Sequence, residues 1–98
     1  MMGIEGKPKK KKVDYEALTS AFMQIPRMDL ETARDLLDLG LRERYELQGR
    51  SAESLYEEIL KKKPKTPRNR LYRLRLAVYC VETEELDPAK LELVFWRD

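Results

Sequence analysis

Apolar residues recur three and four positions apart in the longer segments that lie between the prolines and glycines of this chain. This spacing gathers them on one side of a helix, whereas a strand needs strict apolar and polar alternation, which no segment shows. With 98 residues, the chain is long enough for one hydrophobic core. The sequence therefore predicts an all-α fold, a compact bundle of about five helices formed as a single domain by residues 13–98.

Prolines and capping residues indicate where the first helices begin and end. A helix is expected over residues 13–24, with Val13 and Leu18 on its apolar face. It must stop before Pro26, because the residue that precedes a proline avoids the α region. Asp29 is expected to be the N-cap of the next helix, and Gly40 to end it in a left-handed conformation. Ser51 is expected to be the N-cap of the helix after that.

The longest helix is expected over residues 68–84, opened by Pro67. Its second half is apolar on most sides, which predicts a central position in the bundle. Its arginines crowd the first half and its glutamates the end, against the helix dipole, a mismatch of ~0.3–1 kcal/mol at each exposed end. A last helix is expected to start at Asp87-Pro88 and to close the core with its apolar side chains: Leu91, Val94, Phe95 and Trp96.

The residue types present exclude most enzyme chemistry. The chain has no histidine and one cysteine, Cys80, so it contains neither a Ser-His or Cys-His pair nor a zinc quartet of Cys and His. Asp35 and Asp38 are expected on the outward side of their helix, with no third oxygen ligand beside them. We therefore expect a non-enzymatic protein without a cofactor or a metal ion.

The distribution of apolar residues also bears on location. No apolar run approaches the roughly 18 residues that span a bilayer. The N-terminal lysines are not followed by the apolar stretch of a secretory signal. A lone cysteine fits a reducing compartment. The sequence predicts a cytoplasmic protein with no membrane partner.

A near-neutral net charge of +2 conceals two strongly basic segments. Residues 1–12 carry five lysines and one glutamate without apolar periodicity, and are expected to form a disordered basic tail. Residues 61–75 carry eight cationic side chains and no acidic one. Two basic segments on an otherwise acidic chain predict a bipolar surface.

Several short motifs are similar to those of one protein family. Residues 25–37 (IPRMDLETARDLL) resemble a helix-hairpin-helix motif, a SAM-like unit. Residues 38–41 (DLGL), 46–50 (ELQGR), 55–57 (LYE), 77–79 (AVY) and 95–98 (FWRD) resemble the bacterial pathogenicity-locus family of small helix-hairpin-helix-like proteins, sometimes labelled mitomycin-resistance proteins. The resemblance covers about residues 14–98. It implies a helical fold and no defined biochemical activity.

The hairpin departs from the pattern of DNA-binding members of this motif class. There, glycines let backbone N–H groups approach a phosphate, and the next helix adds its positive end. This sequence keeps Pro26 but has Arg27 and Asp29 in place of the glycines. Arg27 can pair with a phosphate through its guanidinium group, whereas Asp29 brings a negative charge to the phosphate's position.

Two functions remain open at this level. The first is a weak, non-sequence-specific nucleic-acid (DNA or RNA) binding module that contacts the phosphate backbone through basic residues: Arg27, Lys61, Lys62, Lys63, Lys65, Arg68 and Arg70. The alternative is a protein–protein interaction module that binds no nucleic acid. The arginines of the basic segment contribute to the first function only where they are not already paired with acidic side chains, for which the nearest in sequence are Glu53, Glu57 and Glu58.

Overall fold

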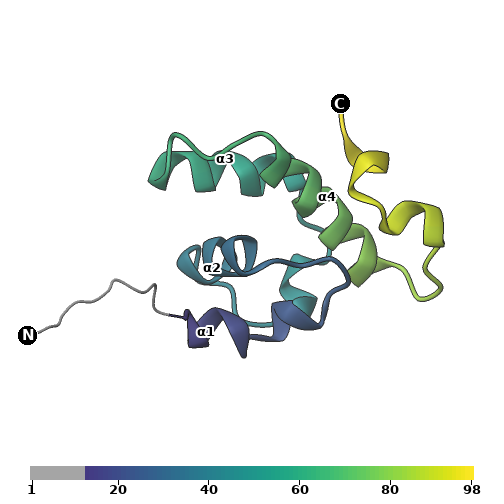
Figure 1. The fold of residues 1–98 in the computed structure, drawn as a ribbon, viewed down its shortest axis with the longest axis horizontal. Helices are drawn as coiled ribbons and strands as arrows, with labels where there is room; N and C mark the ends of the chain where they lie inside the picture. The colour runs from purple at the N-terminus through teal and green to yellow at the C-terminus, as the bar shows by residue number, and fades with distance from the viewer. Residues whose placement is uncertain (1–12) are drawn as a thin grey trace, which may run out of the picture.

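The computed structural model describes residues 13–98, and every regular element within this range is helical. Four α-helices form the body (Figure 1): α1 (Tyr15–Leu18), α2 (Leu30–Asp38), α3 (Ala52–Lys62) and α4 (Asn69–Glu82). One-turn 3₁₀ helices lie between and after them: η2 (Ala21–Gln24), η3 (Arg44–Leu47), η4 (Pro88–Leu91) and η5 (Leu93–Trp96). The all-α prediction is confirmed, while the predicted basic tail lies outside the described residues.

The predicted boundaries of the central helices are confirmed by their backbone hydrogen bonds. Asp29 Oδ1 accepts the N–H of Thr32 at 2.8 Å, and Ser51 Oγ accepts the N–H of Ser54 at 3.2 Å. Gly40 follows α2 with a φ of 91°, a conformation that side chains disfavour. Local chemistry therefore sets the ends of α2 and α3.

The core lies where α2, α3 and the first turns meet α4. Helix α4 contacts α2, α3, η3 and η5, which agrees with the predicted central position (Figure 1). The largest apolar side chains that are at most 2% exposed come from all parts of the body: Phe22, Ile25, Leu36, Leu47, Leu55, Ile59, Leu71, Leu74 and Leu76. Their burial provides the main stabilisation of the fold.

Two predicted helices are replaced by shorter elements with different exposed faces. The expected helix over residues 13–24 is divided into α1 and η2, because Thr19 ends α1 and Ser20 adopts an extended backbone. The change of direction leaves Val13 and Leu18 50% and 43% exposed, so the prediction that both face the core is wrong.

The prediction that the last helix closes the core is also wrong. Residues 87–98, which we call the C-terminal arm, form η4 and η5, and neither turn contains a buried residue. Val94 and Phe95 are 61% and 49% exposed. One-turn 3₁₀ helices cannot present a continuous apolar stripe. Trp96 is half-buried against the body, with its ring centroid 5.5 Å from that of Tyr79.

Candidate nucleic-acid interface

All four arginines of the basic segment 61–75 are ion-paired. They lie at the start of α4, and their carboxylate partners come from other elements: Arg68 with Asp98 at 2.6 Å, Arg70 with Asp35 and with Glu31 at 3.3 Å, Arg73 with Asp29 at 3.1 Å, and Arg75 with Glu53 and Asp98, both at 3.0 Å. Of the acidic residues suggested by sequence, only Glu53 pairs with this segment. Glu58 instead pairs with Arg50, at 3.1 Å. The partners offset the unfavourable charges at the positive end of α4.

Asp35 is the most buried charged group in the described part of the chain. Its side chain is 1% exposed and accepts from Lys63 Nζ at 2.6 Å and from Arg70 Nη1. The prediction that Asp35 faces outward is therefore wrong. A carboxylate can be buried in this way because two cations satisfy both of its oxygens. Arg70 is itself only 11% exposed, so it does not offer its guanidinium group to an external phosphate.

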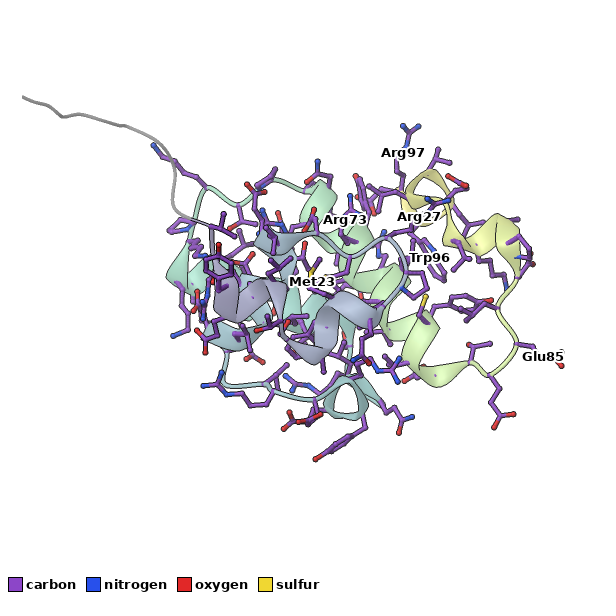
Figure 2. The ribbon with its side chains drawn as sticks, turned by 60° about the horizontal axis from the view of Figure 1, so that its bottom comes forward. Met23, Arg27, Arg73, Glu85, Trp96 and Arg97 are labelled. Carbon is purple, nitrogen blue, oxygen red and sulfur yellow. The ribbon has the colours of Figure 1, made fainter. Side chains whose placement is uncertain are left out.

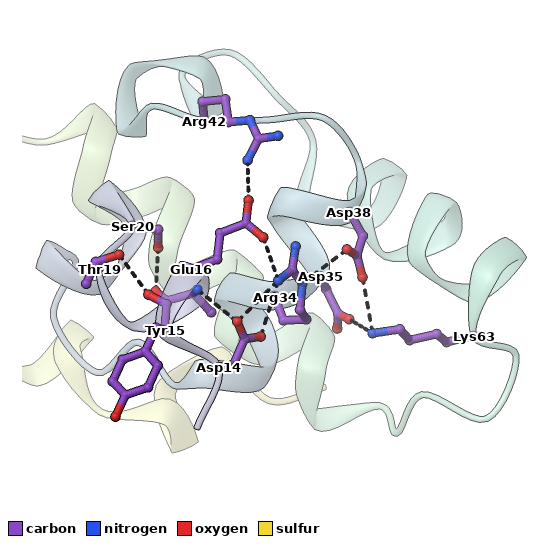
Figure 3. A network of polar contacts seen from close by, with 11 residues as sticks. Asp14, Tyr15, Glu16, Thr19, Ser20, Arg34, Asp35, Asp38, Arg42 and Lys63 are labelled. Carbon is purple, nitrogen blue, oxygen red and sulfur yellow. Dashed lines mark hydrogen bonds and ion pairs between the residues drawn. The ribbon is translucent and has the colours of Figure 1, made fainter. Parts of the chain in front are cut away.

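A second ionic network surrounds Arg34 on the outer side of α2 (Figure 3). Its guanidinium group contacts Asp14 at 3.2 Å, Glu16 at 2.9 Å and Asp38 at 3.1 Å. Arg42 contacts the other oxygen of Glu16 at 2.9 Å. Hydrogen bonds from Arg34 and Arg42 lower the pKa of Glu16. This network fastens α1 and the segment after α2 to α2, and it leaves Arg34 and Arg42 neutralised.

The predicted hairpin is a tight turn over residues 25–28. Met28 N–H donates to the carbonyl oxygen of Ile25 at 3.2 Å, Pro26 takes the second position, and Arg27 takes the third with a φ of 64°. This is the pattern of a type II turn, which favours glycine at its third position. Glycine would adopt this conformation without strain, whereas the residue here is arginine.

The polar groups of this turn are already occupied. Arg73 donates to the carbonyl oxygen of Arg27 and contacts Asp29 at 3.1 Å, which holds the turn against α4 (Figure 2). The Arg27 side chain contacts Glu92 of the C-terminal arm at 3.1 Å and donates to the carbonyl oxygen of Leu91 at 3.2 Å. The turn therefore offers no unpaired guanidinium group to a phosphate in the described state.

Three lysines of the predicted interface have no ion pair with any described residue. Lys61 and Lys62 end α3, and Lys65 lies in the loop that leads to α4; all three are exposed. Lys63 lies between them, 47% exposed, with its ammonium group shared between Asp35 and Asp38. The last turn of α3 and the α3–α4 loop, which we call the lysine loop, are thus the part of the predicted site that retains unpaired positive charge.

Asp98 was not anticipated from sequence, yet several donors of α4 converge on it. Its Oδ2 accepts from Arg68 Nε at 2.6 Å and from the Tyr72 hydroxyl at 3.3 Å, and its Oδ1 lies 3.0 Å from Arg75 Nη1. The hydrogen bond from Arg68, aided by that from Arg75, lowers the pKa of Asp98 to about 2. No local pattern could reveal this cluster, because residues about 30 positions apart form it.

Two structural findings concern other classes of site. Within residues 13–98, no three His, Cys, Asp or Glu side chains are grouped so that they could hold a metal ion. None of the helices in this range has the length and apolar character needed to cross a bilayer. The lone thiol, Cys80, is partly buried, and burial raises its pKa.

The chain matches no protein-family model, no curated protein and no solved structure. The resemblance to the pathogenicity-locus family therefore stays a prediction. The function has to be argued from the geometry of the described residues alone.

Proposed function

We propose that this protein binds nucleic acid weakly and without sequence preference, through the lysines at the end of α3 and in the α3–α4 loop. The observation that carries the proposal is the contrast within one basic segment. The arginines of α4 are paired with carboxylates, whereas Lys61, Lys62 and Lys65 have no ion pair with any described residue. Exposed ammonium groups without a carboxylate partner suit the phosphate backbone, which presents charge without sequence information.

The geometry narrows the set of expected contacts. Arg70 is left out because it is buried against Asp35. Arg27 and Arg68 would first have to leave Glu92 and Asp98, and Lys63 would have to leave Asp35. Three lysines that neutralise three phosphates predict a slope of about −3 for the logarithm of affinity against the logarithm of salt concentration on duplex DNA.

Fluorescence anisotropy with labelled duplex and single-stranded oligonucleotides tests this proposal. Binding is expected at about 50 mM salt and is expected to weaken steeply as salt is added. The variant Lys61→Gln/Lys62→Gln should lose most of the affinity. The control Arg44→Gln/Arg97→Gln removes two other exposed cations that have no ion pair within residues 13–98, and should change affinity little. Equal losses in the two variants, or no binding of the unchanged chain, would contradict the proposal.

The exposed apolar residues of the C-terminal arm favour a second candidate, a protein–protein interaction module. Val94 and Phe95 are half exposed or more and lie beside each other on η5. Exposed apolar side chains that are clustered can mark a contact surface. Sedimentation of the unchanged chain and of Val94→Ser/Phe95→Ser separates the candidates. Self-association that the variant abolishes supports this second function and does not depend on the lysine loop.

A further inference from the structure

We infer that Arg68, Tyr72 and Arg75 form a phosphate site on α4 that Asp98 of the C-terminal arm occupies in the described state, so that the arm and a nucleic-acid backbone compete for it. The site adds to the nucleic-acid binding proposed above, on which it rests, but it uses different residues. The Asp98 side chain bound there shows which kind of group the site can bind. A carboxylate that carries one negative charge is bound there through both of its oxygens.

The donors are arranged before any ligand arrives. Positions 68, 72 and 75 follow each other four and three residues apart, so they lie on one side of α4. Glu53 contacts Arg75 Nε at 3.0 Å, and the Arg75 guanidinium carbon lies 5.8 Å from the centroid of the Tyr72 ring. These two contacts come from the body, whereas Arg75 Nη1 also donates to the carbonyl oxygen of Trp96 in the arm at 2.7 Å; the Arg75 side chain is 21% exposed. Only the occupant, Asp98, belongs to a segment without buried residues.

A phosphodiester meets the same requirements as the Asp98 carboxylate. It carries one negative charge, and its two free oxygens can accept from the two guanidinium groups. Exchange of Asp98 for a phosphate therefore conserves both the charge and the hydrogen bonds of the site.

The arm can leave without opening the core. Its ion pairs to the body are largely exposed, with the side chains of Arg27 and Glu92 54% and 60% exposed and those of Arg68 and Asp98 55% and 44% exposed. Exposed pairs of this kind contribute little to stability and are weakened by salt. Trp96 also contacts the Tyr79 ring, and its carbonyl oxygen accepts from Arg75 Nη1 at 2.7 Å, but none of these three residues is fully buried.

Release of the arm would extend the lysine surface of the proposed function. Arg68 follows Lys65 by three residues, at the point where the α3–α4 loop enters α4. Figure 1 shows the C-terminal end of the chain beside this start of α4. Departure of the arm also removes Glu92 from Arg27. The closed arm thus masks cations that adjoin the loop.

The variant Asp98→Asn tests the inference, with affinity for a fluorescein-labelled single-stranded oligonucleotide measured by anisotropy. It is expected to bind about fivefold more tightly than the unchanged chain, with a salt slope steeper by about 1 because Arg68 becomes available. The matched control is Glu85→Gln, which removes the same charge from an exposed residue that has no ion pair within residues 13–98 (Figure 2). In a chain that already carries Arg68→Gln, the gain from Asp98→Asn should largely disappear.

The outcomes separate this inference from the proposed function. If the unchanged chain binds through its lysines while Asp98→Asn and Glu85→Gln behave alike, the competing arm is refuted and the lysine loop stands. If only Asp98→Asn binds, the masked site is supported. The lysines alone are then not sufficient for binding, which refutes the proposed function as stated. If neither chain binds, both ideas fail. Asp98 is an exposed residue outside the core, so circular dichroism should show equal helix content in all of these variants.

Discussion

Asp35 Oδ1 lies 2.6 Å from Lys63 Nζ, and this contact ties a carboxylate of α2 that is 1% exposed to the loop that follows α3. Arg70 of α4 contacts the other oxygen of the same group. One buried carboxylate therefore joins three elements of the body. It also removes two cations from the basic segment that is the candidate interface.

Substitution of Asp35 by asparagine is expected to lower the free energy of unfolding by about 3 kcal/mol, because removing one partner of a buried ion pair leaves the other without compensation. Arg70, 11% exposed, would keep the exposed Glu31, at 3.3 Å, as its only charged partner. Urea denaturation measures the loss. Asp38→Asn is the control, since Asp38 is 35% exposed and its pairs should be worth about 1 kcal/mol or less. Equal losses of unfolding free energy in the two variants would show that the burial of Asp35 does not make its ion pairs more stabilising than exposed ones.

Attachment of the C-terminal arm is expected to depend on pH. The pKa of Asp98 in the folded chain is about 2, below its ordinary value of 3.8. A lowered pKa means that the charged form favours the docked arm. This contribution is complete above about pH 3.8 and is lost as the pH falls from there toward 2.

Trp96 gives a direct readout of this change, because it is the single tryptophan of the chain and belongs to the arm. Its indole N–H donates to the carbonyl oxygen of Lys90 at 2.8 Å, and its ring packs on Tyr79. Its emission should shift to longer wavelength as the pH falls through this window. In Asp98→Asn the shift should be present already at neutral pH. Identical titrations of the two chains would rule out Asp98 as the anchor of the arm.

The sequence predicted those features of the fold that depend on neighbouring residues. The caps Asp29 and Ser51 and the stop at Gly40 are formed as expected, because each acts on backbone groups within a few positions. The environment of Asp35 could not be predicted, since its partners lie 28 and 35 residues away in the chain. Composition alone did not show that the basic segment divides into paired arginines and unpaired lysines.

The candidate site was predicted only in part, because some of its features depend on neighbouring residues and others on residues far apart in the sequence. From Pro64 and Pro67 a loop is expected over residues 61–67; the structure places Lys63 and Lys65 in it, but Lys61 and Lys62 still belong to the last turn of α3. Whether the adjoining arginines are available depends on Asp98, which lies in an arm whose position no local pattern specifies. The exposure of Val94 and Phe95 was missed because apolar spacing does not reveal how short the final turns are.

Thr32 is expected to tolerate valine well. Its side chain is completely buried, and its Oγ1 has no hydrogen-bond partner among the described residues. Its backbone N–H is capped by Asp29, a bond that valine keeps. Because a buried hydroxyl without a partner is unfavourable, Thr32→Val should raise the free energy of unfolding by about 1 kcal/mol. Thr32→Ser keeps the hydroxyl and loses a methyl group, so thermal unfolding should show it to be less stable than the unchanged chain. The reverse order of these two variants would contradict the assignment of Thr32 Oγ1 as unsatisfied.

Arg27 allows a test of the turn that resembles the hairpin motif. Its φ of 64° lies in the left-handed region, which is unfavourable by roughly 1–2 kcal/mol for residues with a Cβ atom and readily accessible to glycine. Arg27→Gly and Arg27→Ala both remove the contact with Glu92, so the difference between them isolates the backbone. Glycine loses more chain entropy on folding, which offsets part of its advantage. Arg27→Gly should therefore be more stable than Arg27→Ala by about 1 kcal/mol in urea denaturation. A more stable alanine variant would mean that the turn does not require a left-handed residue at this position.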